Sequence, residues 1–186
     1  MEFMCVDFLN SDWRDWRGSG RREDRLDSPE WWSSFCSRWD LDAPMPPDGE
    51  IRAALGELRA HMRSMIEAMA AGAPLAEQDL QALNRALEQL AVHPKLLVTR
   101  DAYRLQQVAL TEGWPYAVGR IAESFAKLLA EEDVRRLKIC DNEDCRWIYY
   151  DESRNRARRW CDDKACGNLI KVRRFRERQK EKGTTK

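Results

Sequence analysis

The sequence of 186 residues lacks the features that define several large classes of protein. No apolar run approaches the roughly 18 residues that a membrane-spanning helix needs, so we expect neither a membrane protein nor a membrane partner. The first residues carry no basic segment and no small-residue cleavage site, which predicts a cytoplasmic protein without a secretory signal. There is no Gly-rich phosphate loop, nucleophile elbow or HExxH motif, so we do not expect an enzyme.

Charge is balanced over the whole chain, with 32 basic and 32 acidic residues, but it is distributed unevenly. Residues 138–186 contain 15 Lys and Arg against 9 Asp and Glu, which gives a net charge of +6. The preceding residues carry 17 basic against 23 acidic side chains, a net charge of −6. This asymmetry predicts an acidic domain over residues 1–136, followed by a basic module over residues 137–186 that binds a polyanion.

The first domain contains several segments in which apolar residues recur with the spacing of an amphipathic helix. Good helix-capping residues precede two of these segments, since Ser28 is followed by Pro29 and Asp48 by a long apolar stripe. The predicted helices run from Ser28, from Asp48 to about Ala71, over about 77–91, and from Trp114.

The remaining parts of the first domain predict a hairpin and a loop. Residues 95–100 and 103–110 have the composition of two short strands around Asp101. Residues 11–27 are rich in Gly, Ser, Arg and Asp, and we expect a mobile loop there. The fold class predicted from these segments is α+β, with a mainly helical N-terminal domain and a small hairpin.

Four of the six cysteines form two close pairs, Cys140-x4-Cys145 and Cys161-x4-Cys166, separated by fifteen residues. Without a secretory signal, this pattern favours a metal site over a disulfide framework. Zinc binds four thiolates, and a closed site of this kind leaves no position for a catalytic water. We therefore predict one structural Zn²⁺ held by these four cysteines; the alternative is four buried cysteines without a metal.

The segments around the cysteines predict a treble-clef-like zinc finger. Residues 147–150 are β-rich, 151–155 form a polar turn, and 156–160 are expected to return as a second strand. A helix is predicted from the last cysteine to about Lys180.

Two runs within this module, Arg158-Arg159-Trp160-Cys161 and Cys166-Gly167-Asn168, resemble the CGNR zinc-finger family. The resemblance covers about residues 137–180 and implies a bacterial transcription regulator. The fourth residue of the name motif is Leu169 here, where the family has Arg. This departure removes one cation, and Lys171, Arg173 and Arg174 are the basic residues that could compensate for it.

The N-terminal part is similar to the ABATE domain, which accompanies this finger and is regarded as a stress-induced regulator. The matching pieces are Val6–Asn10, the Trp31–Trp39 helix and Leu83-Asn84. If the finger binds DNA, this domain is expected to bind an effector or to form a homodimer. Asn10, Trp32 and Asn84 are the candidate ligand-binding residues, because they lie in the matching pieces. The alternative is that the tryptophans belong to the core or an interface.

Double-stranded DNA is the partner that the basic module and the resemblance together predict. The candidate contacts form two clusters: Arg154, Arg156, Arg158 and Arg159 on the turn and return strand, and Lys171, Arg173, Arg174, Arg176 and Arg178 on the last helix. Two alternatives remain open. A basic C-terminal helix is often a solvated end, with Arg173 paired to Glu177, and the module could instead be a zinc-stabilised adaptor that binds an acidic protein.

Overall fold

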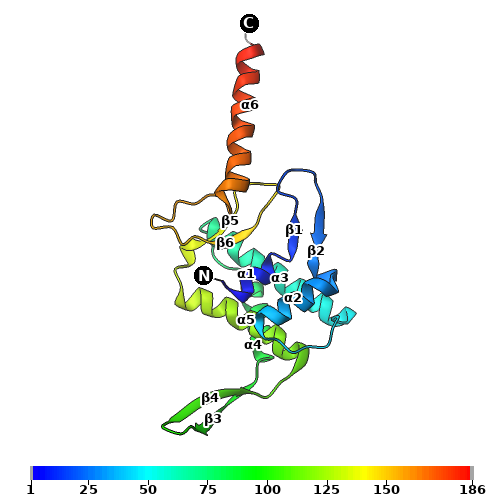
Figure 1. Ribbon diagram of the computed structural model, residues 1–186, viewed down its shortest axis with the longest axis vertical. Coiled ribbons are helices and arrows are strands. Elements are labelled where there is room, and N and C mark those ends of the chain that lie inside the picture. The colour runs from blue at the N-terminus through cyan, green and yellow to red at the C-terminus, as the bar shows by residue number, and fades with distance from the viewer. Residues whose placement is uncertain (1, 185–186) are drawn as a thin grey trace.

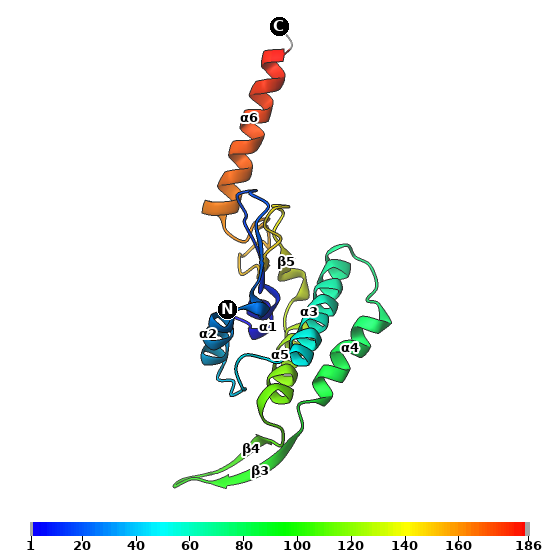
Figure 2. The ribbon, with the colours of Figure 1, turned by 90° about the vertical axis from the view of Figure 1, so that its right-hand side faces the viewer.

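The computed structural model describes residues 2–184, and side chains as far as residue 180. A helical body forms its middle, a two-stranded hairpin projects from one end, and the last helix projects from the other (Figures 1 and 2). Within the described residues, no helix combines the length and the apolar character that crossing a membrane requires.

The body is built from five helices, and the predicted helices are all present. Their bounds are α1 Met4–Leu9, α2 Pro29–Trp39, α3 Gly49–Ala70, α4 Glu77–Glu88 and α5 Gly113–Glu131. The two predicted caps are confirmed, because Ser28 Oγ accepts a hydrogen bond from the Trp31 N–H and the Asp48 carboxylate accepts one from the Ile51 N–H. Each cap satisfies an amide that the first helical turn would leave unpaired.

The core lies where α1, α2, α3 and α5 meet. Its largest fully buried side chains include Phe8, Met62, Phe125 and Trp32. The Trp32 ring packs edge-on against Trp114 at a centroid distance of 4.9 Å, and its N–H donates to the Leu26 carbonyl. With its one polar group satisfied, Trp32 contributes its whole ring to the core.

The prediction of a mobile loop over residues 11–27 is wrong. Strands β1 (Asp12–Arg14) and β2 (Arg22–Asp24) pair there as an antiparallel hairpin. Its stabilising contacts are ionic, since the Asp12 carboxylate pairs with Arg14 and Arg22, and the Asp24 carboxylate with Arg59 on α3. A hairpin stabilised in this way shows no apolar alternation in its sequence, which is the signal that would have predicted strands.

The predicted hairpin is confirmed, although its first strand begins three residues earlier than predicted. Strands β3 (Val92–Val98) and β4 (Tyr103–Ala109) pair antiparallel over seven residues each. This hairpin extends away from the body (Figure 2).

A third hairpin begins the cysteine module, and it differs from the expected one. Strand β5 (Leu137–Ile139) pairs with β6 (Ile148–Tyr150), so the first cysteine pair lies in the connection between them. Residues 156–160 form no strand, which corrects that prediction. They are held as a loop, because Lys138 Nζ donates to the carbonyls of Arg156 and Arg158.

The module and the body share buried contacts. Leu137 and Ile148 belong to the same apolar core as the helices. The side-chain amide of Asn10 donates to the Ile148 carbonyl at 2.8 Å and accepts from the Ile148 N–H at 2.9 Å. Asn10 therefore completes the outer edge of β6 as a strand would.

Candidate metal centre

The structure brings the four predicted cysteines together. The sulfurs of Cys140, Cys145, Cys161 and Cys166 all lie within 4.8 Å of one another. The Sγ atoms of Cys145 and Cys161 are 3.7 Å apart, and those of Cys161 and Cys166 are 3.9 Å apart. Two thiolates bound to one tetrahedral Zn²⁺ at the usual Zn–S distance of about 2.3 Å lie about 3.8 Å apart. The spacing and the all-sulfur donor set therefore fit one zinc ion.

The backbone of the first pair is folded by a short turn. The N–H of Cys140 donates to the Trp147 carbonyl, and the N–H of Cys145 donates to the Asn142 carbonyl, both at 2.8 Å. Arg146 follows with a φ of 54°, a left-handed conformation that reverses the chain into β6. This turn directs both sulfurs of the pair to the same point.

Cys166, the second cysteine of the second pair, is positioned by the start of the last helix. A π-helical turn over Asp163–Gly167 carries Cys166, and it continues directly into α6 (Asn168–Thr184). The Asp162 carboxylate caps this turn by accepting from the N–H groups of Lys164 and Ala165. A Cβ on Gly167 would lie 3.2 Å from the Trp160 ring, so the glycine of the name motif allows this ring to approach the backbone closely.

The electrostatics of the cluster also favour a divalent cation. Hydrogen bonds from the thiols of Cys145 and Cys161 lower the pKa of Cys140. Once Cys140 is a thiolate, its hydrogen bonds raise the pKa of both Cys145 and Cys161. These three sulfurs therefore cannot all ionise beside one another unless a cation compensates their charge.

Aromatic and polar side chains enclose the cysteines. Tyr149, Trp16, Trp147 and Trp160 pack against them and reduce their contact with water. The buried Asn142 donates to the Trp16 carbonyl at 2.8 Å and lies 3.4 Å from Cys166 Sγ. A hydrogen bond to a ligating sulfur is a common way in which a protein orients a metal ligand. This role of Asn142 could not be predicted from the sequence, because its partners lie 24 and 126 residues away.

A buried ion pair fixes the loop between the two cysteine pairs. The fully buried carboxylate of Asp151 accepts from Lys138 Nζ at 2.7 Å, from the N–H and hydroxyl of Ser153, and from the N–H of Arg158. Burial alone would raise the pKa of Asp151, but the hydrogen bonds from Lys138 and Ser153 outweigh it and hold the pKa well below its usual range. The sequence pattern predicts only a polar turn at Asp151 and does not indicate this role.

The first cluster of candidate DNA contacts is largely used within the molecule. Arg156 pairs with Asp133 at 3.2 Å, and Arg159 pairs with Asp141 at 2.6 Å. Arg158 donates to the Cys161 carbonyl and stacks on Tyr149. Arg154 is exposed and has no carboxylate partner among the described residues.

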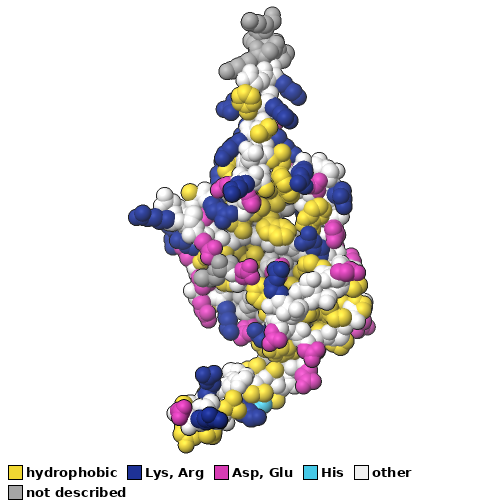
Figure 3. Space-filling view, in the orientation of Figure 1, with side chains coloured by type: hydrophobic (Ala, Val, Ile, Leu, Met, Phe, Trp, Pro, Cys, Tyr) yellow, Lys and Arg dark blue, Asp and Glu magenta, His cyan; other side chains and the backbone are white. Residues whose placement is uncertain are grey.

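The second cluster lies along α6, whose 17 residues extend about 25 Å from the zinc module (Figure 3). Arg173 is the one member of this cluster that pairs with a described carboxylate. Its guanidinium donates to the Asp144 carboxylate at 2.7 Å and to the Arg17 carbonyl at 2.8 Å. The predicted pairing of Arg173 with Glu177 is therefore replaced by a contact to Asp144. The other four cations, Lys171, Arg174, Arg176 and Arg178, are exposed and form no ion pair with a described residue.

The structure does not bring the three candidate ligand residues together. Trp32 is buried in the core, Asn84 is exposed on α4, and the Asn10 amide is used by β6. Ligand binding by these residues stays a prediction.

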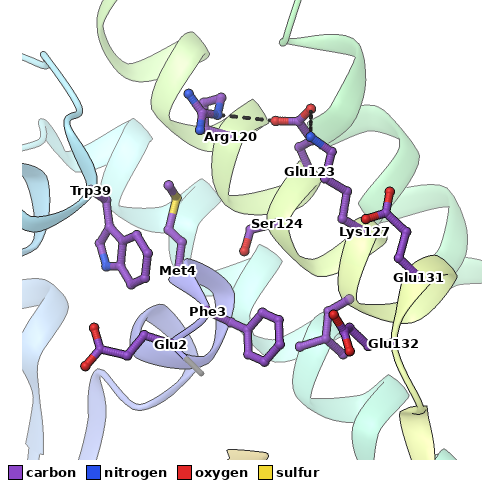
Figure 4. A pocket seen from close by; sticks show the side chains of 11 residues that line it. Glu2, Phe3, Met4, Trp39, Arg120, Glu123, Ser124, Lys127, Glu131 and Glu132 are labelled. Carbon is purple, nitrogen blue, oxygen red and sulfur yellow. Dashed lines mark ion pairs between the residues drawn. The ribbon is translucent and has the colours of Figure 1, made fainter.

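A cavity of about 300 Å³ lies elsewhere, where α1 and the end of α2 face α5 (Figure 4). Phe3 and Trp39 form one side, and the ion pairs of Glu123 with Arg120 and Lys127 form the other.

The two remaining cysteines are buried in the body, which agrees with the expectation of unreactive thiols. Burial raises the pKa of Cys5 to about 11 and also raises that of Cys36. A thiol with a raised pKa is mostly protonated at neutral pH and is a poor nucleophile.

The fold and the cysteine cluster define a zinc-finger protein in which a four-cysteine module is joined to a helical body. The family model ABATE, described as "Putative stress-induced transcription regulator", matches residues 2–132, and the CGNR zinc finger matches residues 136–179. The chain therefore belongs to the ABATE family and carries a CGNR zinc finger. Both matches are to regulator and zinc-finger families, and neither is an enzyme family. No curated protein matches the chain.

Proposed function

We propose that this protein is a transcription regulator that binds double-stranded DNA through α6 and the zinc module. The observation that supports this proposal most strongly is that several cations on α6 are exposed and unpaired with described carboxylates. Lys171, Arg174 and Arg178 recur at intervals of three and four residues, so they lie along one face of the helix. They are exposed and have no described carboxylate partner, so phosphates would not have to displace an internal ion pair.

The zinc module would hold the first turn of α6 in a fixed position. Cys166 lies on the π-helical turn that leads directly into α6, so a zinc ion bound to the four cysteines would fix the start of the helix relative to the loop that carries Arg154. Arg173 adds a second attachment through Asp144 and the Arg17 carbonyl. In this arrangement Arg173 positions the helix, while Lys171, Arg174 and Arg178 contact DNA. Direct reading of bases would require α6 to enter the major groove.

The experiment that tests this proposal compares two charge-matched variants of the full-length, zinc-loaded protein. Arg174→Glu with Arg178→Glu should reduce duplex binding by at least about 100-fold at low salt and flatten the salt dependence of the dissociation constant. The control, Lys95→Glu with Arg104→Glu, makes the same charge change on the hairpin at the other end of the molecule. Equal binding by both variants, or binding without salt dependence, would contradict the proposal.

We propose further that residues 1–136 form the regulatory domain, which binds an effector or mediates assembly, and that residues 137–186 form the DNA-binding domain. Support for an effector comes from the cavity beside Trp39, where an aromatic ring and several charged groups converge. The adaptor alternative makes a different prediction, since its α6 would bind an acidic protein and no nucleic acid.

A further inference from the structure

The β3–β4 hairpin exposes most of the large apolar side chains found on the surface. Of the ten large hydrophobic residues that are exposed in the described chain, six lie on this hairpin or directly after it: Val92, Leu96, Val98, Tyr103, Leu105 and Leu110. Figure 3 shows hydrophobic side chains gathered over this end of the molecule. The exposed fraction is 76% for both Val98 and Tyr103, so they have almost no contact with the body.

The apolar side chains of the two strands lie on one face. Side chains alternate between the faces of a strand, so Leu96 and Val98 share a face with their cross-strand partners Leu105 and Tyr103. This apolar face consists of Val92, Pro94, Leu96, Val98, Tyr103, Leu105, Gln107 and Ala109, and it carries no charge. The opposite face, which we call the polar face, carries His93, Lys95, Arg104 and Gln106 together with Leu97 and Val108.

A two-stranded hairpin with an uncovered apolar face is marginally stable by itself in water. Exposed apolar surface of this extent is typical of a site that another surface covers. The apolar face is uncharged and the polar face is basic. A partner would therefore cover the apolar face and leave the polar face in contact with solvent.

We propose that the apolar face of a second copy of this chain covers the hairpin, so that two hairpins pack face to face in a homodimer. Self-association is favoured because no other described surface of the chain offers a matching apolar area. The remaining large exposed hydrophobic residues are Met45 between α2 and α3, Leu80 on α4, and Val172 and Phe175 on α6. A contact between two identical faces also closes on itself as a dimer, whereas a head-to-tail contact between the hairpin and α6 would form a ring or a filament.

The area and the placement of the hairpin suit such an interface. Covering the apolar face would bury roughly 500 Å² on each copy, about 1,000 Å² in total, which reaches the lower limit for a specific interface. The hairpin and α6 project from opposite ends of the body, so this dimer leaves α6 uncovered (Figure 1). The inference specifies the assembly role proposed for the N-terminal domain and does not depend on DNA binding.

Sedimentation equilibrium of the full-length, zinc-loaded protein without DNA tests the proposal. We expect a mass near twice the 21.8 kDa of one chain at micromolar concentration. Leu96→Glu with Leu105→Glu should raise the dimer dissociation constant by about 100-fold or more, because it places charges at the centre of the interface. The control, His93→Glu with Gln106→Glu, adds matching carboxylates on the polar face of the same strands and should leave dissociation unchanged.

We expect each variant to fold, because Leu96 and Leu105 are 61% and 67% exposed and lie outside the core. Zinc content and far-UV circular dichroism check this. A wild-type protein that stays monomeric up to about 100 μM would overturn the proposal, because a dimer is expected at micromolar concentration. So would a dimer that both variants weaken equally, or one that neither variant weakens. DNA binding by a monomer would leave the proposed function intact while refuting this interface.

Discussion

Replacing Lys138 by Met breaks the buried ion pair that holds the loop between the cysteine pairs. The ammonium lies 2.7 Å from the Asp151 carboxylate and also donates to two backbone carbonyls, those of Arg156 and Arg158. Methionine keeps most of the apolar stem but offers no donor, so the buried carboxylate loses its cation and two carbonyls lose a partner.

The expected magnitude follows from the burial of the two partners. Removing one partner of a buried ion pair costs about 3–5 kcal/mol of unfolding free energy. Asp151 is fully buried and keeps its bonds from Ser153 and Arg158, while the Lys138 side chain is 24% exposed, so water can partly replace it. We therefore expect a loss near the lower limit, about 3 kcal/mol.

The loss should be constant between pH 8 and pH 5. Because the hydrogen bonds from Lys138 and Ser153 lower the pKa of Asp151 in the folded protein, its contribution is fully present above the unfolded-state pKa of about 3.9. The contribution disappears only as the pH falls through the lower, folded-state pKa.

Urea denaturation of the zinc-loaded protein, followed by tryptophan fluorescence, measures the effect. Adding Asp151→Asn to Lys138→Met should recover at least about 1 kcal/mol, because the isolated buried charge is then removed. A loss below about 1 kcal/mol for Lys138→Met, or a double variant that is less stable than Lys138→Met alone, would refute the argument.

Three further substitutions test other contacts. Trp32→Ala should cost about 3–5 kcal/mol in thermal or urea unfolding because it empties the core, and a cost near zero would show that the ring is not buried. Asn10→Ala should cost about 2 kcal/mol and increase amide exchange at Ile148, and unchanged exchange there would contradict the two hydrogen bonds between Asn10 and Ile148. Gly167→Ala should weaken zinc binding by about 3- to 10-fold in chelator competition because its Cβ crowds Trp160; equal affinity would show that the ring yields.

The sequence predicted the elements whose signals are local. Ser28 and Asp48 cap helices because each contacts an amide three residues away, and such a contact depends only on neighbouring residues. The cysteine spacing predicted the cluster for a similar reason, since each close pair forms one short turn and zinc chemistry then requires the pairs to meet.

The elements that sequence analysis missed depend on partners far along the chain. Strand β1 is stabilised by Asp12 with Arg22, and these residues have the composition of a loop. The expected strand over residues 156–160 is instead a loop held by Lys138, some 20 residues earlier.

The candidate DNA contacts show the same limit. A run of basic residues does not reveal which cations have internal partners, because those partners are distant carboxylates. Arg156 and Arg159 pair with Asp133 and Asp141, whereas Arg174 on α6 has no described carboxylate partner. Trp32 likewise lay in a family-like segment, and only the packing of α2 against Trp114 places it in the core.

Selection of binding sites from random duplex DNA by the full-length, zinc-loaded protein tests the central claim most directly, with chelator-treated protein as the control. We predict an enriched sequence motif whose enrichment is lost on chelation and is strongly reduced by Arg174→Glu with Arg178→Glu. No enrichment by the zinc-loaded protein, or an enrichment that survives both chelation and these substitutions, would contradict a regulator that binds DNA through its zinc module and α6.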